Sequence, residues 1–268
     1  MKTIIIAFIT VWILSQTGQA QTHYEKEIPD VKKVLIEKIP GKLIIKQSPD
    51  NVFRIETDKQ PEIVEDERAK GLSPVSGNYD NTGLGLALIQ SGSNVTISGP
   101  NQFNNDGDYT LFIPGEVAVS VDLANPFSGK MVEITGLNNP LEVKTIGGQI
   151  KFTDISGPAI FHSISGDIEG TFSTLSQKAP SSITCVSGLI DIALPGNTPA
   201  ELSMMSVSGK IYSDFNIERE ASGKNQDSRA KNLSEITGIG QKTNGKINGG
   251  GTKLILQSIS GNIYIRNK

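Results

Sequence analysis

The sequence predicts an all-β protein of the β-solenoid class, on the strength of three observations. One short element recurs five times, apolar residues alternate along the segments beside it, and helical periodicity is nearly absent. The element reads Ile or Val, Ser or Gly, Gly, any residue, and Ile. Its copies are Ile146–Ile150, Ile164–Ile168, Val186–Ile190, Val207–Ile211 and Ile259–Ile263.

Glycine marks the repeat. The central glycines of the five copies follow one another at spacings of 18, 22, 21 and 52 residues, and a looser copy falls 9 residues from each of its two neighbours. The predicted corner glycines are Gly148, Gly157, Gly166, Gly188, Gly209 and Gly261. A period of about 20 residues with a half-period of about 10 is typical of repeat architectures.

Each repeat is interpreted as strand, corner, strand. Glycine adopts a positive φ without a Cβ clash, which suits a corner, and the flanking β-branched residues favour extended backbone. A single unit has one apolar stripe and cannot bury it alone, whereas stacked units bury a continuous apolar column. An antiparallel sandwich also has short strands at intervals of 8–12 residues and stays open as the alternative.

The other segments complete one domain over residues 21–268. Residues 21–57 hold strand candidates that we expect to form a capping layer, because a solenoid needs its first turn covered. Residues 58–82 are predicted to form a long loop, and residues 216–232 a solvated excursion from the stack. The charged ending after Gly261 is expected to protect a terminal edge strand.

The first 20 residues have the pattern of a signal peptide. Met1-Lys2 is a short positive region, Ile4–Leu14 is apolar, and Gly18-Gln19-Ala20 supplies small residues for cleavage after Ala20. The apolar run is too short for a membrane span, which needs about 20 residues. Since no cysteine follows the cleavage site, we expect no lipoprotein anchor. The mature chain is expected in the periplasm or outside the cell, with no membrane span.

Charge and cysteine content exclude several classes of function. The chain carries 25 basic and 28 acidic side chains, so it lacks the strongly basic character that nucleic acid or an anionic membrane surface attracts. Cys185 is the single cysteine, which excludes an intrachain disulfide and a multi-cysteine metal site. We therefore expect no metal and no cofactor.

Three passages resemble the bacterial family of putative adhesin domains, which are exported envelope domains of β-strand repeats with unknown function. They are Tyr109–Pro114, Lys144–Ile168 and Gly245–Ile265. The resemblance is clearest over residues 109–268. It implies a right-handed parallel β-helix in the cell envelope, and it supplies no catalytic or binding residues. A likeness of fold is by itself a weak argument for function.

Candidate catalytic groups are few. Asp167, Glu169 and Asp191 could line one wall of a stack and serve a polysaccharide lyase or hydrolase, but exposed acids on a strand face are common. His162 and Ser163 are adjacent in a predicted strand, so their side chains should point to opposite faces. No serine–histidine pair is expected there.

The function expected from the sequence is that of a non-enzymatic exported scaffold. It would act as an adhesin or an interaction protein of the cell envelope and bind an unidentified protein or a surface glycan. Two alternatives stay open: a polysaccharide-active lyase or hydrolase, and a partner in envelope stress or assembly.

Overall fold

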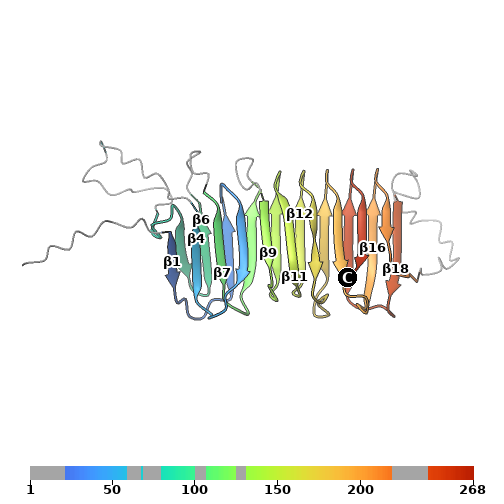
Figure 1. The fold of residues 1–268 in the computed structure, drawn as a ribbon, viewed down its shortest axis with the longest axis horizontal. Coiled ribbons are helices and arrows are strands. Elements are labelled where there is room, and N and C mark those ends of the chain that lie inside the picture. Colours follow the sequence, from blue (N-terminus) through green and yellow to red (C-terminus); the bar gives the residue numbers. More distant parts are fainter. Residues whose placement is uncertain (1–21, 59–67, 69–79, 100–106, 125–130, 219–240) are drawn as a thin grey trace, which may run out of the picture.

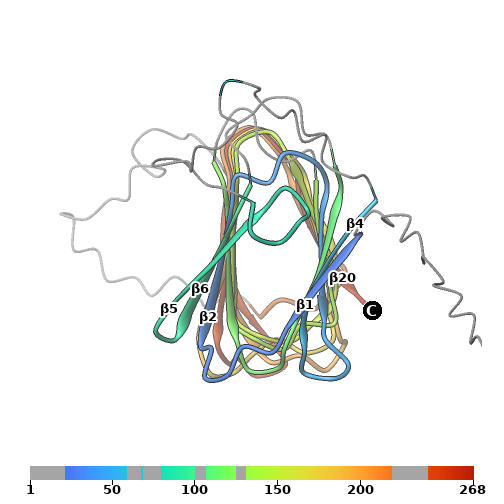
Figure 2. The same ribbon diagram turned by 90° about the vertical axis from the view of Figure 1, so that its left-hand side faces the viewer.

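The structure, a computed structural model, describes residues 22–58, 68, 80–99, 107–124, 131–218 and 241–268. These residues form two ten-stranded sheets that face each other, as the view along the stack in Figure 2 shows. None of the described residues belongs to a helix long and apolar enough to cross a membrane. The predicted all-β class is therefore confirmed (Figure 1).

The first sheet, sheet A, consists in spatial order of β1 (His23–Lys26), β4 (Phe53–Thr57), β7 (Tyr109–Ile113), β3 (Leu43–Gln47), β9 (Met131–Thr135), β11 (Gln149–Ile155), β13 (Ile168–Phe172), β15 (Ile190–Leu194), β20 (Ile263–Asn267) and β17 (Ile211–Ser213). The second, sheet B, consists of β18 (Gln241–Ile247), β16 (Ala200–Ser206), β19 (Lys253–Ser258), β14 (Ser181–Cys185), β12 (Ala159–Ser163), β10 (Leu141–Thr145), β8 (Ala118–Leu123), β2 (Lys33–Glu37), β6 (Asn94–Ser98) and β5 (Ala87–Ser91).

The middle of the molecule follows the repeat. From β8 to β15 the chain alternates between the sheets, and each strand from β8 to β13 pairs in parallel with the strand two places further along the chain. Val143 of β10, for example, lies between Val121 and Phe161. The sheets as wholes are mixed, because β1, β4, β5 and β18 pair antiparallel at the ends.

The order of strands at one end differs from the order of the sequence. β19 and β20, the last two strands, lie between β14/β15 and β16/β17. The expected terminal edge strand with a charged ending is therefore wrong, since β20 is paired on both sides. This insertion explains the 52-residue spacing before Gly261. The strand that follows Gly261 is β20, which pairs with β15 and β17 instead of following β17 at the end of the stack.

The other end has a related arrangement. β2 and β3 lie inside the stack, between β6 and β8 in sheet B and between β7 and β9 in sheet A. Of the four strands within residues 21–57, only β1 and β4 lie at the end of a sheet, and β5 lies at the same end of the other sheet. Most of the loop predicted over residues 58–82 lies outside the described residues.

The core lies between the two sheets. Burial alternates along the strands, as in Ser181–Cys185, so the inward residues form apolar columns. The aromatic ring of Phe152 packs against Phe161 and Phe172 at centroid distances of 5.2 and 5.1 Å. The first apolar residue of the repeated element lies outside this core: Ile164 is 40% exposed and Ile259 48%.

Each end of the core is covered by apolar side chains. At the β18 end, Phe215 and Ile217 pack on the core, and a backbone bridge joins Glu218 to Lys246. At the β1 end, the buried hydroxyl of Tyr109 donates a hydrogen bond of 2.8 Å to the Leu84 carbonyl. Residues 219–232, the rest of the predicted excursion, lie outside the described residues.

Candidate functional site

The five glycines of the strict repeat stack along one edge of the molecule. A Cβ atom on Gly166 would lie 2.1 Å from the carbonyl oxygen of Gly148, and one on Gly261 would lie 1.9 Å from that of Gly188. Gly209 approaches Gly261 in the same way, at 2.1 Å. None of the five has a positive φ, so the expected conformational reason is wrong. Glycine is required here because successive corners touch.

Gly157 belongs to the opposite edge. It lies between β11 and β12, and a Cβ atom there would be 1.9 Å from the carbonyl oxygen of Asn139. This is the same kind of close approach on the turn that leads from sheet A back to sheet B. Ala20, the predicted cleavage position, lies outside the described residues.

Beneath the stacked glycines runs a column of buried polar side chains that the sequence reasoning missed. Its members, each three residues before a corner glycine, are Thr145, Ser163, Cys185, Ser206 and Ser258. Ser258 Oγ accepts from the Gly261 amide at 2.8 Å and donates to the Gly188 carbonyl at 3.2 Å, and Ser206 joins Gly209 to Gly261 in the same way. Ser258, Ser206 and Cys185 in this buried polar column bond to the neighbouring corner, whereas Thr145 bonds to the Gly148 carbonyl of its own corner. The recurrence of a small polar residue at glycine minus three is the signal that could have found it.

Cys185 takes the place of serine in this column. Its thiol donates to the Gly166 carbonyl at 3.3 Å, and its burial raises its pKa, so the group stays protonated at neutral pH. The geometry fits the prediction of an inert structural thiol.

We expect Cys185→Ser to change the free energy of unfolding by less than about 1 kcal/mol, because a hydroxyl makes the same two contacts. Cys185→Val, which fills similar space, should cost about 1–3 kcal/mol by leaving the Gly166 carbonyl and the Gly188 amide unpaired. Urea denaturation of both variants measures the difference. Equal stability of the two would contradict a bonding role for this column.

The acidic residues singled out from the sequence lie on or beside the outer face of sheet A. Glu169 stands between Lys151 and Asp191 in register, so two of the candidates are neighbours. Asp191, however, accepts hydrogen bonds from Nε and Nη2 of Arg266, both at 2.7 Å, and Asp167 Oδ1 accepts one from the Leu189 amide at 2.9 Å. These two carboxylates hold strands and corners together.

Two further polar side chains also have structural partners. Asp154 lies at an irregularity of β11 with φ 54°, and its bond to the Lys268 ammonium lowers the pKa of its carboxyl group. His162 is exposed on sheet B, where Nδ1 lies 2.7 Å from the Thr184 hydroxyl, while Ser163 beside it is buried. The expectation that His162 and Ser163 face opposite ways is confirmed.

One group on sheet A has the composition of a recognition surface. Tyr212 and Tyr264 stack with their ring centroids 5.1 Å apart and their planes 7° apart, and Tyr212 is 45% exposed. The guanidinium of Arg266 lies 5.3 Å from the Tyr264 ring centre while it holds Asp191. We name Asp191, Tyr212, Tyr264 and Arg266 the tyrosine–arginine cluster. Its members come from β15, β17 and β20 and meet because β20 inserts between the other two.

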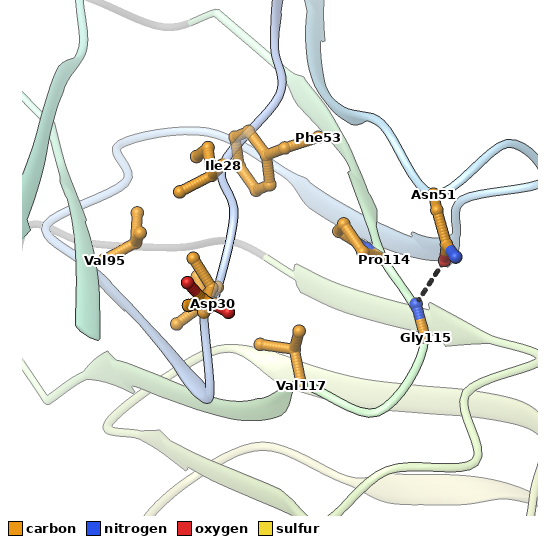
Figure 3. A pocket seen from close by; sticks show the side chains of 10 residues that line it. Ile28, Asp30, Asn51, Phe53, Val95, Pro114, Gly115 and Val117 are labelled. Atoms are coloured by element: carbon orange, nitrogen blue, oxygen red, sulfur yellow. Dashed lines mark hydrogen bonds between the residues drawn. The ribbon is translucent and has the colours of Figure 1, made fainter. Parts of the chain in front are cut away.

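A cavity of about 230 Å³ lies at the β1 end of the molecule. Figure 3 shows Ile28 beside Phe53, with Val95 and Val117 on other sides of the space. Asp30 is the single charged residue among those that line it. The Gly115 amide donates to Asn51 Oδ1 at 3.1 Å and fixes one rim. A lone carboxylate in an apolar space provides no acid–base pair.

Within the described ranges, no three His, Cys, Asp or Glu side chains gather where they could hold a metal ion. No protein-family model matches the chain, and no curated protein matches it either. Two solved bacterial structures are similar to it. A putative cell adhesion protein from Clostridium sporogenes shares 10% identity at a TM-score of 0.46, over 92% of this chain and 99% of the other. A putative adhesin from Bacteroides fragilis shares 13% at a TM-score of 0.29, over 92% and 96%.

Proposed function

We propose that this chain is an exported β-solenoid that acts, without catalysis, as an adhesin or interaction scaffold of the cell envelope. The succession β8 to β15, in which strands alternate between two parallel stacks, supports the solenoid, with the right-handed winding that the family resemblance implies. The signal-peptide pattern of residues 1–20 supports export. The partner is a protein or a glycan at a cell surface.

The tyrosine–arginine cluster is the observation that carries the binding role. Tyrosine and arginine dominate the energetics of protein recognition, because each offers a large flat surface together with hydrogen-bonding groups. Here the exposed Tyr212 ring stacks on the Tyr264 ring. The two residues are paired in the neighbouring strands β17 and β20, which fixes both backbones. The bidentate bond to Asp191 holds the arginine in place.

The carboxylates argue for binding over catalysis. Asp191 is occupied by Arg266 and Asp167 by a backbone amide, so a lyase or hydrolase would have to break structural bonds to use them. Glu169 would be left as a single acid, whereas glycoside hydrolysis uses two carboxyl groups. A role in envelope assembly predicts instead a stable complex that is recovered from membranes by pull-down.

We expect the double variant Tyr212→Ala/Tyr264→Ala to lose at least tenfold in binding of the purified protein to bacterial or host cells. The variant removes both stacked rings from the cluster. Ile160→Ala, which shortens a side chain that is 50% exposed on the opposite sheet, is the matched control and should bind as the original does. Binding is measured by flow cytometry with labelled protein.

Treating the cells beforehand identifies the class of partner. Loss of binding after periodate indicates a glycan, and loss after proteinase indicates a protein. If the double variant binds as well as the original protein while both stay folded, the cluster is not the recognition surface and this proposal fails.

A further inference from the structure

A hollow of about 200 Å³ lies on the outer face of sheet B, over strands β16, β18 and β19. Its lining is mainly polar and holds three lysines against one glutamate; the lining residues are Glu201, Leu202, Ser203, Lys242, Asn244, Gly245, Lys246 and Lys253. Leu202 and Gly245 alternate toward the core, so the groups offered to solvent are amino, carboxylate, hydroxyl and amide. We name it the lysine hollow.

Strand register sets the arrangement of these groups. Glu201 stands between Lys253 on one neighbouring strand and Lys246 on the other. In the next outward position Ser203 stands beside Asn244, and beyond it Lys242 is paired with Met205. Two lysines therefore flank the carboxylate at one end of the hollow, a hydroxyl and an amide lie in the middle, and a third lysine closes the far end.

Within the described part of the chain, five of the six polar side chains of the lysine hollow have no bonding role in the fold, whereas Lys246 has other interactions. Among the residues that the structure describes, the side chains of Glu201, Ser203, Lys242, Asn244 and Lys253 make no hydrogen bond and no ion pair. Other acids on the outer faces are paired, for example Glu142 with Lys144 and Glu133 with Lys42. Polar groups that converge on a concave space without pairing are typical of a ligand site.

The mixture of groups points to one chemical class. The ammonium groups of Lys242 and Lys253 outnumber the single carboxylate of Glu201, so the hollow carries an excess of positive charge although the whole chain has a net charge of −3. This excess favours an anion. Glu201 would repel a bare phosphate but can accept hydrogen bonds from hydroxyl groups, and Ser203 and Asn244 can both donate and accept. An anion that also carries hydroxyl groups can pair with the lysines through its charge and with Glu201, Ser203 and Asn244 through hydrogen bonds.

We propose that the lysine hollow binds an acidic sugar residue, with its carboxylate at the lysines and its hydroxyl groups at Glu201, Ser203 and Asn244. The hollow and the tyrosine–arginine cluster belong to different sheets, so this site stands apart from the one that carries the proposed function. A chain with both would hold an anionic glycan on one face and its surface partner on the other.

The test is titration calorimetry of the purified protein with three acidic probes: tetragalacturonate, tetraglucuronate and N-acetylneuraminic acid. We expect at least one probe to bind, its methyl ester to bind at least tenfold more weakly, and 0.5 M salt to weaken binding as screening requires. Lys253→Gln and Lys242→Gln should each weaken binding about fivefold to tenfold, whereas Lys253→Arg should retain it.

Two control variants show whether a probe binds at the lysine hollow. Lys33→Gln removes the same charge from an exposed position at the other end of sheet B and should leave binding unchanged. Ile160→Ala, a change of an exposed apolar side chain on the same sheet, should leave it unchanged too. The proposed function is tested separately by cell binding of Tyr212→Ala/Tyr264→Ala, so its failure is distinguishable from failure here. Binding of inorganic phosphate as tight as that of the acidic sugars would overturn the assignment to sugars. Absence of binding by all three probes, or equal binding of the methyl esters, would overturn the site.

Discussion

The variant Gly166→Ala is expected to lose about 3 kcal/mol or more of folding free energy, although it adds a single methyl group. The methyl carbon would lie 2.1 Å from the Gly148 carbonyl oxygen and 2.6 Å from its carbon, and both belong to backbone that is held in the neighbouring corner. The Gly166 corner is held by the bond that the Gly166 amide donates to Ser163 Oγ at 2.8 Å, and the Gly148 corner by the bond that its carbonyl accepts from Thr145 Oγ1 at 3.0 Å.

A matched control lies beside the glycine that Gly166 touches. A Cβ atom on Gly147 would meet nothing within 4 Å, and the φ of this residue is not positive. Gly147→Ala should therefore be neutral or stabilising by up to about 1 kcal/mol, because alanine restricts the unfolded chain. Urea denaturation gives both values. If Gly166→Ala is as stable as Gly147→Ala, the corners do not stack as described.

The second large effect is expected in the aromatic part of the core. Phe152→Ala should cost about 3–5 kcal/mol, since it leaves a cavity between Phe161 and Phe172. Phe112→Ala removes the same atoms from the outer face of sheet A, where the ring lies near Lys46 and Arg54. That change should cost about 1 kcal/mol or less. If both variants lose a similar amount of unfolding free energy, the claim that Phe152 packs in the core is contradicted.

The sequence predicted the all-β class and the position of most strands, because both depend on local patterns. Strand candidates were predicted within residues 21–57, and the structure contains β2 and β3 there. The regular corners identified the repeat. These signals lie within about 20 residues of one another, so they can be detected in the sequence alone.

The order of the strands could not be predicted in the same way. Nothing local distinguishes β19 and β20, which carry the repeat like the others, from strands that stack in chain order. Their insertion is decided by pairing between residues 52 positions apart, such as Tyr212 with Tyr264. The tyrosine–arginine cluster depends on that insertion, so it was missed although all of its residues were visible.

The role of the glycines shows a different limit. A repeated glycine is compatible with a positive φ and with close approach, and the sequence does not choose between them. In the structure Gly166, Gly188 and Gly261 have no positive φ, and each lies against the carbonyl oxygen of the neighbouring corner glycine. The polar residue three places earlier, as in Ser163 and Ser258, would have favoured this choice, because its bond to the glycine amide fixes the turn.

The central claim, that this chain acts at a cell surface on a partner outside the cell, is tested most directly by antibody labelling of intact cells. Antibodies raised against the purified protein cannot cross an intact envelope. We predict that they label intact cells that express this protein to the same extent as permeabilised cells, while antibodies against a periplasmic marker label permeabilised cells alone. Labelling that appears only after permeabilisation would contradict the claim and leave a role inside the envelope.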